Sequence, residues 1–414
     1  MRIPLPSQPL SAALRQPPPE EAWQDGAVRG LDRYREAVLD AVRPLGSEPS
    51  RRERAAGRYL AAAAVARQAS PPYACSAMDG YAVHSADVAG PVELPVVRVL
   101  YAGDAPGGLL RPGEAARIFT GAPLPEGADA VVREEAAEEA AGRVRFREAA
   151  RRGDHVRGAG EDVAAGGEAL PAGRRLGPRQ MALLAAVGTD EVQVVRRLRV
   201  ALLCTGDELV RGRTPDSNGA ALAGLLAGLG AEVAAATVGD ELEAIRSAVE
   251  RGLAAADAVV TTGGVSVGAH DLVPEALELL SAEVRVHGVP MKPGKPFLFA
   301  LCREKPVFAL PGSPSACLVA FEVFARPALL KMAGASACAR PSALLPLAEA
   351  VEGRRGRARF LWAELAPGGR ARPLGRDAAQ VRGPALADLL LHVPEGTGDL
   401  APGELVEAWL VGEG

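Results

Sequence analysis

The first apolar positions of the chain follow the spacing of a helix. Five of them recur every three or four residues and form one face of a helix expected over 31–42, namely Leu31, Tyr34, Val38, Leu39 and Val42. A second helix is predicted over about 49–68, and Pro71-Pro72 would end it because proline cannot continue a helix. The proline-rich residues 1–27 are predicted to be a flexible lead-in.

Short strand-like runs replace the helical spacing from residue 72 to residue 149. Glycine and proline separate these runs, which predicts a small β-rich domain. The dense charge at 136–152 indicates a solvated hairpin or loop. Residues 150–197 are predicted to return to 28–71, so that both segments form one elongated, discontinuous domain with the β-rich domain inserted in it. The strand-like runs are 92–101, 115–119 and 130–133.

Strands and helices alternate from residue 198 to residue 333. Two continuous apolar runs, 198–204 and 258–262, are typical of buried strands, and the helix expected over 241–256 has one apolar face. Alternation of this kind predicts a parallel sheet with helices on both faces. The other elements expected here are helices at 219–229, 274–280 and 314–333, and strands at 232–238, 284–289, 297–302 and 306–310.

The last segment, 334–414, lacks helical spacing and is rich in glycine and proline, so a small β-barrel or sandwich is predicted. The fold class is therefore a multidomain α/β protein. This assignment agrees with the 414-residue length, which exceeds what one hydrophobic core usually serves.

Composition excludes several classes of function. The formal net charge of -4 and the aromatic content of 4% give neither a basic field nor stacking platforms for nucleic acid. No stretch of about 18 apolar residues is free of charge, glycine or proline, so no membrane helix is expected. The five cysteines form no C-x-x-C pair, which argues against a zinc site or a disulfide framework and fits a reducing cytoplasm.

Glycine, hydroxyl and lysine side chains follow the strands of the α/β segment. Ligands of open parallel sheets bind outside the carboxyl ends of the strands. Gly263-Gly264 and Gly268 would let backbone N–H groups face a phosphate, and Ser266 would add a hydroxyl. Lys292 and Lys295 would add positive charge. Neither G-x-x-x-x-G-K-[ST] nor G-x-G-x-x-G occurs, so nucleotide hydrolysis and nicotinamide binding lose their main support.

Three carboxylates accompany this expected anion site. Glu208 follows the first strand, Asp271 follows the glycine-rich loop, and Asp240 follows the second strand. Carboxylates that face a phosphate normally do so through Mg²⁺, and Glu208 and Asp271 are the predicted ligands. Each carboxylate alone would more often cap a helix, so the prediction depends on several loops meeting at one sheet edge.

Six ordered motifs resemble the molybdopterin molybdenumtransferase family, to which MoeA and the gephyrin E-domain belong. The resemblance covers about 73–330. The motifs are SAMDGYAV at 76–83, FTGAPLPEGADAVV at 119–132, TGDEL at 205–209, GGVSVG at 263–268, MKPGKP at 291–296 and LPG-x-P at 310–314.

The resemblance implies a four-domain subunit in an elongated homodimer whose active site is shared between subunits. It implies insertion of molybdenum from molybdate into adenylylated molybdopterin, with Mg²⁺ assisting and AMP released. The molybdopterin adenylyltransferase and acceptor molybdoenzymes are further partners to expect. The alternatives are a tungsten-inserting or catalytically altered paralogue and a non-catalytic scaffold that keeps the fold. The short, single-domain adenylyltransferase lacks the segment that carries SAMDGY.

The resemblance also assigns roles to matching positions. Asp79 and Thr120, from the partner chain, would act on the reacting end of the substrate. Glu208, Asp271 and Asp240 would hold Mg²⁺ on the pyrophosphate, while Lys292 and Lys295 attract molybdate. The residues predicted to bind the substrate are Thr205, Gly206, Asp207, Ser217, Asn218, Gly263, Gly264, Ser266, Gly268, Pro311, Gly312 and Pro314.

The sequence departs from the family pattern at several positions. Ala74 and Cys75 stand where Asp and Asn are usual, and an expected Asn is Asp388. Where the family usually has LPGNPVS, this chain ends the motif with Ser313-Pro314-Ser315-Ala316. An amide is lost and a hydroxyl moves by one position. Because serine and amide groups suit oxyanion coordination, these changes bear on the metal preference more than on the fold.

Overall fold

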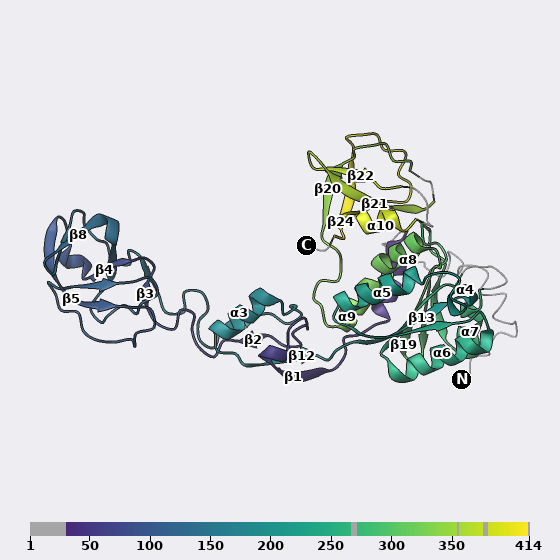
Figure 1. The fold of residues 1–414 in the computed structure, drawn as a ribbon, viewed down its shortest axis with the longest axis horizontal. Coiled ribbons are helices and arrows are strands. Elements are labelled where there is room, and N and C mark those ends of the chain that lie inside the picture. The colour runs from purple at the N-terminus through teal and green to yellow at the C-terminus, as the bar shows by residue number, and fades with distance from the viewer. Residues whose placement is uncertain (1–29, 266–270, 354–355, 376–379, 413–414) are drawn as a thin grey trace, which may run out of the picture. The chain divides into compact units, whose positions relative to one another are not determined.

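The computed structural model describes residues 30–265, 271–353, 356–375 and 380–412. The described chain falls into two compact units, one built from Glu48–Ala56 and Leu60–Val194 and the other from the remaining residues (Figure 1). None of the helices in these ranges has the length and apolar content that a membrane span needs.

The larger unit contains a six-stranded sheet in the order β14-β13-β15-β19-β18-β16. Four neighbouring strands, β14, β13, β15 and β19, are parallel, as the alternation of strands and helices predicts. The strands are β13 (Arg199–Thr205), β14 (Glu232–Val238), β15 (Ala258–Thr262), β16 (Glu283–His287), β18 (Leu298–Cys302) and β19 (Lys305–Leu310).

The last two strands of this sheet depart from the predicted parallel arrangement. β18 pairs antiparallel with β19, and β16 pairs antiparallel with β18. Only Arg303 and Glu304 connect β18 to β19, and both have positive φ values, 52° and 63°. A two-residue connection of this kind forms a tight hairpin, because a parallel crossover needs a dozen residues or more.

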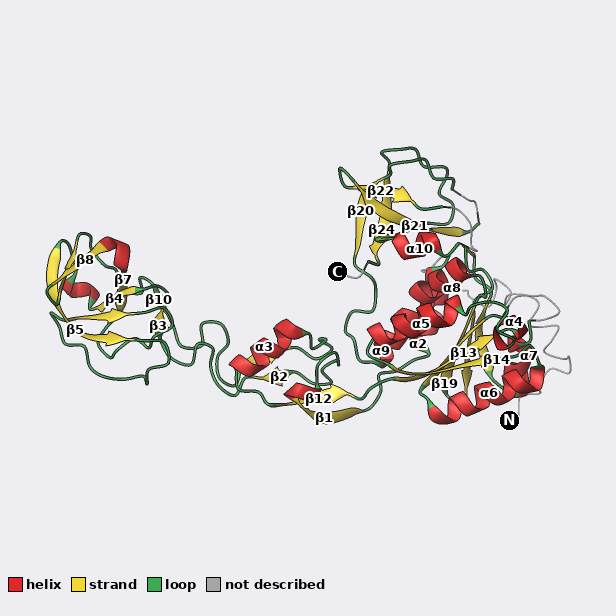
Figure 2. Cartoon of the chain, viewed as in Figure 1, coloured by secondary structure: helices red, strands yellow, loops and turns green. Residues whose placement is uncertain are grey.

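Helices cover both faces of the sheet, as predicted. In Figures 1 and 2, α5 lies on one face of the sheet and α6 and α7 lie on the other. Leu222 of α5 and Phe324 belong to one core, whereas Ile245 of α6 and Val273 of α7 belong to the other. The helices are α2 (Asp32–Asp40), α4 (Asp207–Val210), α5 (Ser217–Gly228), α6 (Leu242–Ala255), α7 (Val273–Leu279) and α8 (Pro314–Ala320), which continues through the π-helical turn η5 (Phe321–Ala325) into α9 (Arg326–Met332).

The C-terminal residues form the second sheet of this unit, in the order β17-β21-β23-β24-β20, with β22 also paired to β21. One strand, β17, comes from the α/β segment, and its Lys292 pairs in parallel register with Arg359 of β21. The elements are β17 (Met291–Lys292), β20 (Ser342–Pro346), β21 (Ala358–Ala366), β22 (Arg370–Pro373), α10 (Arg382–Leu386), β23 (Leu389–Val393) and β24 (Leu405–Leu410).

The other unit contains a six-stranded sheet in the order β7-β4-β6-β5-β9-β8 and three two-stranded sheets. The charged segment forms the hairpin β8–β9, which turns at Ala141-Gly142. The elements are β3 (Cys75–Ser76), β4 (Gly80–Val83), η3 (Ser85–Asp87), β5 (Val92–Leu100), β6 (Ala115–Ile118), β7 (Ala130–Arg133), η4 (Glu134–Ala136), β8 (Ala137–Ala140), β9 (Arg143–Phe146), β10 (Val156–Arg157) and α3 (Pro178–Ala186).

The helix predicted over 49–68 is wrong. This segment instead contains β1 (Ser47–Arg51), the 3-10 turn η2 (Arg52–Arg54) and β2 (Ala64–Val65), and the chain returns through β11 (Glu168–Leu170) and β12 (Glu191–Val195) to pair with β2 and β1. Long-range strand pairing overrides the helix propensity of the alanine-rich sequence. The domain boundaries expected from the sequence stay predictions.

Asp257 is a buried charge that stabilises the larger unit. The Arg196 guanidinium donates to both carboxylate oxygens at 2.7 Å, and the Arg199 N–H donates at 2.9 Å. Burial alone would raise the pKa of Asp257, but the hydrogen bonds from Arg196 and Arg199 outweigh it and hold the pKa below its usual value.

Asp257→Asn is therefore expected to lower the free energy of unfolding at pH 7 by about 2 kcal/mol. Because the folded pKa lies below the unfolded one, the contribution is present above about pH 4 and is lost as pH falls through the folded pKa. Urea unfolding at pH 7 and at pH 3 measures this difference. Glu283→Gln, which breaks the exposed ion pair with Arg285, is the control, and an equal loss in both variants would contradict the assignment.

Candidate active site

A cleft of about 420 Å³ opens at the carboxyl ends of β13, β14 and β15, where the sequence predicts an anion site. The loops that follow these strands and the one that follows β19 all reach it. Its lining includes Thr205, Gly206, Glu208, Asp216, Ser217, Asn218, Asp240, Thr262, Gly263, Gly264, Asp271, Gly312 and Pro314.

Hydrogen bonds tie the cleft loops to one another. The Asn218 amide donates to Thr262 Oγ1 at 2.9 Å and to the Gly312 carbonyl at 2.8 Å. The Thr262 hydroxyl donates to the Pro311 carbonyl at 3.1 Å, and the Thr205 hydroxyl donates to the Thr262 carbonyl at 3.3 Å. These polar side chains therefore fix the loops around the cleft as well as lining it.

Carboxylates surround the cleft, but not all of them are available to a ligand. Asp216 caps α5 by accepting from the Gly219 N–H at 2.7 Å, and Asp240 accepts from the Asp207 N–H at 3.1 Å. Glu208 is exposed, and its carboxylate makes no hydrogen bond or ion pair within the described ranges. It is the cleft carboxylate best suited to meet an incoming cation.

Gly263 permits a close approach between two of the loops. Its φ of +92° is a backbone conformation that side chains rarely adopt, and a Cβ there would lie 2.6 Å from Thr205 Oγ1 and 2.7 Å from the Thr205 carbonyl oxygen. A glycine is therefore required for the backbone of this loop to line the cleft.

Gly263→Ala is expected to lower the free energy of unfolding by about 2 kcal/mol, because it combines positive-φ strain with a clash against backbone. Gly224→Ala is the matched control. Gly224 lies within α5 with open space around it, so alanine there should stabilise by about 0.5 kcal/mol or more. Chemical denaturation of both variants tests the pair, and equal effects of the same sign would contradict the steric argument.

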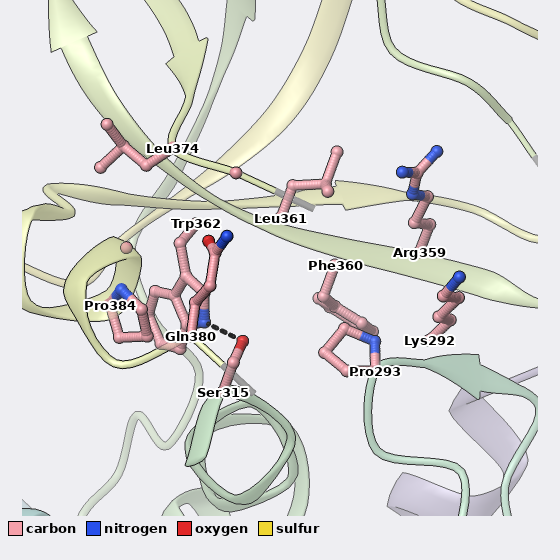
Figure 3. Close-up of a pocket in the computed structure, with 12 residues that line it drawn as sticks. Lys292, Pro293, Ser315, Arg359, Phe360, Leu361, Trp362, Leu374, Gln380 and Pro384 are labelled. Atoms are coloured by element: carbon pink, nitrogen blue, oxygen red, sulfur yellow. Dashed lines mark hydrogen bonds between the residues drawn. The ribbon is translucent and has the colours of Figure 1, made fainter. Parts of the chain in front are cut away.

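A second, smaller pocket of about 30 Å³ lies between the α/β segment and the C-terminal sheet. Lys292 and Arg359 lie side by side on β17 and β21 at its edge (Figure 3). Ser315, in the first turn of α8, accepts a hydrogen bond from the Trp362 indole at 2.9 Å (Figure 3). Pro314 lines the larger cleft and Ser315 lines this pocket. Because both residues belong to the first turn of α8, the cleft and the pocket border the same end of that helix.

Asp79 and Thr120 lie together in the other unit. The Thr120 backbone N–H and its hydroxyl both donate to Asp79 Oδ1 at 2.7 Å. These two hydrogen bonds, helped by the charge of Arg117, hold the pKa of Asp79 below its usual value. Asp79 is thus an ionised, exposed and oriented carboxylate at neutral pH.

Most of the residues predicted for the α/β segment lie together at the cleft, but the two predicted lysines do not. Lys292 lines the smaller pocket rather than the cleft, and the exposed Lys295 lines neither. Asp207 and Pro311 support the cleft through backbone contacts to Asp240 and Thr262. Ser266 and Gly268 lie outside the described residues.

Sequence reasoning missed Arg359 and Trp362, since only the pairing of β17 with β21 brings them to Lys292. It noted the hydroxyl of Ser315 only as a departure from the family pattern. This hydroxyl lies in the smaller pocket, whereas Ala316, where the family pattern has serine, is buried in α8. Asp388 has a structural role, because its carboxylate accepts the Leu365 N–H at 3.1 Å.

Three family models match consecutive parts of the chain. They describe a MoeA N-terminal region (domain I and II) at 29–188, a probable molybdopterin binding domain at 201–331, and a MoeA C-terminal region (domain IV) at 345–411. Together they account for both units and for both sheets of the larger one.

Relatives and solved structures agree with these matches. Molybdopterin molybdenumtransferase 2 of Mycobacterium tuberculosis is 35% identical over 402 residues, covering 92% of this chain and 99% of that protein. A molybdopterin molybdenumtransferase of Nostoc is 40% identical over 67% of each chain. The crystal structure of a molybdopterin biosynthesis MoeA protein from Pyrococcus horikoshii OT3 has a TM-score of 0.79 and 26% identity, and covers 93% of this chain and all of that one. The chain belongs to the molybdopterin molybdenumtransferase (MoeA) family.

Proposed function

We propose that this chain is a molybdopterin molybdenumtransferase, which joins molybdate to adenylylated molybdopterin and releases AMP. Two dithiolene sulfurs replace two oxygens of molybdate, which leave as water. One water is consumed in breaking the phosphoanhydride P–O bond. The observation that carries the proposal is the pairing of a glycine-lined cleft at the sheet edge with a neighbouring pocket bordered by two adjacent cationic side chains, in a chain of this family.

The cleft loops bind and orient the phosphates of the substrate in this proposal. Gly263 and Gly264 both have positive φ values, which allows successive backbone N–H groups to turn towards an anion. The hydroxyl of Ser217, which also lines the cleft, supplies a further donor. Because Asn218 and Thr262 already hold the loops together, little ordering remains to be done on binding.

Mg²⁺ fits the donor groups of the cleft if the substrate completes its coordination. Among the described residues, no three acidic, histidine or cysteine side chains gather closely enough to form a metal cage. Mg²⁺ normally uses one or two protein carboxylates together with substrate phosphates. Glu208 and Asp271 would hold it, with Asp240 nearby. When bound, the ion neutralises charge on the pyrophosphate.

Molybdate binds at the open edge of the smaller pocket in this proposal. Lys292 and Arg359 concentrate two positive charges there, which suits a doubly charged oxyanion. Trp362 donates its N–H to Ser315 Oγ, which leaves the hydroxyl proton of Ser315 available to an anion oxygen. Tungstate has nearly the same size and charge, so it belongs in the same test.

Asp79 and Thr120 act on the reacting end of the substrate from a second copy of the chain. This part of the proposal rests on family membership and on the ionised, oriented state of Asp79. Asp79 accepts a hydrogen bond or a proton from the group being replaced, and Thr120 keeps the carboxylate in position.

Incubation of the protein with adenylylated molybdopterin, Mg²⁺ and either molybdate or tungstate tests the proposed function. We expect AMP release and formation of a metal-bearing pterin that both depend on the added oxyanion. AMP release that is equal with and without either oxyanion would refute metal insertion. Size-exclusion chromatography with light scattering tests the dimer independently, and a monomer with full activity would refute the shared site.

A further inference from the structure

An exposed aromatic stack lies beside Asp79 and Thr120 and has no role so far. The rings of Tyr101 and Phe119 stack with their centroids 5.1 Å apart and their planes 9° apart. The guanidinium carbon of Arg117 lies 5.6 Å from the Phe119 ring centroid. Tyr101 nevertheless keeps 55% of its surface exposed, so one face of its ring is open.

Strand register places these groups on one face of the sheet. Arg117 of β6 pairs with Val99 of β5 on one side and with Tyr81 of β4 on the other. Side chains two residues apart along a strand share a face. Phe119, Tyr101 and Asp79 lie one residue beyond the ends of these strands and two residues from these partners. The Phe119 ring contacts both Arg117 and Tyr101, and the charge of Arg117 acts on Asp79, so all three lie on the side of Arg117.

The polar groups on this face are mutually satisfied and fix the stack in place. Arg117 pairs with Glu134 at 2.8 Å and with Glu139 at 3.2 Å. The Tyr81 hydroxyl donates to Glu139 at 2.7 Å. A cation held in this way supports Phe119, and Phe119 supports Tyr101. The stack is therefore pre-organised, with an open aromatic face at one end and a hydrogen-bonding carboxylate next to it.

We propose that Tyr101 and Phe119 form a stacking platform for a planar heterocycle of the substrate, either the pterin or the adenine. This inference rests on the proposed role of Asp79 and Thr120 at the reacting end. Thr120 directly follows Phe119, so a substrate engaged at Asp79 carries its ring system within reach of the platform. Small-molecule sites combine a flat apolar surface with a few polar groups that fix orientation, as here.

The test compares Tyr101→Ala with Tyr101→Phe in the full-length protein. Base-aromatic stacking predicts a rise of roughly tenfold in KM for adenylylated molybdopterin in Tyr101→Ala, with kcat less affected and with Tyr101→Phe close to wild type. Calorimetric titration of AMP and of a phosphorylated pterin, each alone, identifies the ring, because only the stacked compound should lose affinity in Tyr101→Ala. Leu109→Ala is the control, because Leu109 is similarly exposed at 58% in the same unit and is not one of the two stacked rings.

Several outcomes would overturn the platform. One is an unchanged KM together with unchanged affinity for both probes in Tyr101→Ala. Another is an equal loss in Tyr101→Phe, which would assign the effect to the hydroxyl. A third is a loss of dimer without loss of probe affinity, which would make this face a protein interface. Glu208→Ala tests the proposed function separately. If Glu208→Ala is inactive while the Tyr101 variants give one of these outcomes, the proposed function survives and the platform fails.

Discussion

Replacing Glu208 with alanine is expected to abolish molybdenum insertion and leave the fold intact. The carboxylate lines the cleft, is exposed and makes no ion pair within the described ranges, so its removal leaves no buried group unsatisfied. Loss of a metal-holding carboxylate at a transferring phosphate should lower the rate of AMP release at least about 100-fold. The assay is AMP release and cofactor formation with saturating molybdate, together with the midpoint of thermal unfolding.

Glu208→Gln separates charge from shape, because the amide keeps the size of the side chain but binds Mg²⁺ poorly. Higher Mg²⁺ concentrations should restore part of its activity and little of that of Glu208→Ala. Glu232→Ala is the matched control, since Glu232 is an exposed acid at the opposite end of β14 from the cleft. Full activity in Glu208→Ala would refute the assigned site, whereas equal losses in Glu208→Ala and Glu232→Ala would indicate a general effect of charge.

The cleft could be predicted from the sequence because its residues follow strands in chain order. Parallel strands bring their carboxyl ends to one edge, so Glu208, Asp240 and Gly263 meet there once the alternation of strands and helices is recognised. No long-range pairing had to be known. The cap that Asp216 provides to α5 likewise depends only on local chemistry.

The smaller pocket could not be predicted in this way. Lys292 and Arg359 are separated by 67 residues in the chain, and only the addition of β17 to the C-terminal sheet joins them. The same limitation explains the helix wrongly predicted over 49–68, where pairing with 168–195 decides the structure. Local patterns carry no information about such partners. By contrast, the short connection at Arg303-Glu304 was a local signal for the antiparallel hairpin.

Lys292→Ala is expected to lower molybdenum insertion about 100-fold at limiting molybdate, with the loss mainly in KM for molybdate. Lys292 and Arg359 are direct neighbours across two strands, and like charges in that arrangement repel. Arg359 is partly balanced by the Glu352 carboxylate 3.8 Å away, whereas no ion pair joins Lys292 to a carboxylate within the described ranges. The lysine thus contributes positive charge for an incoming anion, and its repulsion with Arg359 lowers the stability of the unliganded protein.

This arrangement gives the variant a signature that a purely structural lysine would not have. Removing the charge should leave the unfolding midpoint unchanged or slightly raised while activity falls, and Lys292→Arg should keep part of the activity because it keeps the charge. Arg285→Ala, at an exposed position of β16 whose ion pair with Glu283 is also exposed, should change neither quantity. A Lys292→Ala protein that loses stability in step with activity, or that keeps the wild-type KM for molybdate, would show that the paired cations hold the sheets together and do not bind the oxyanion.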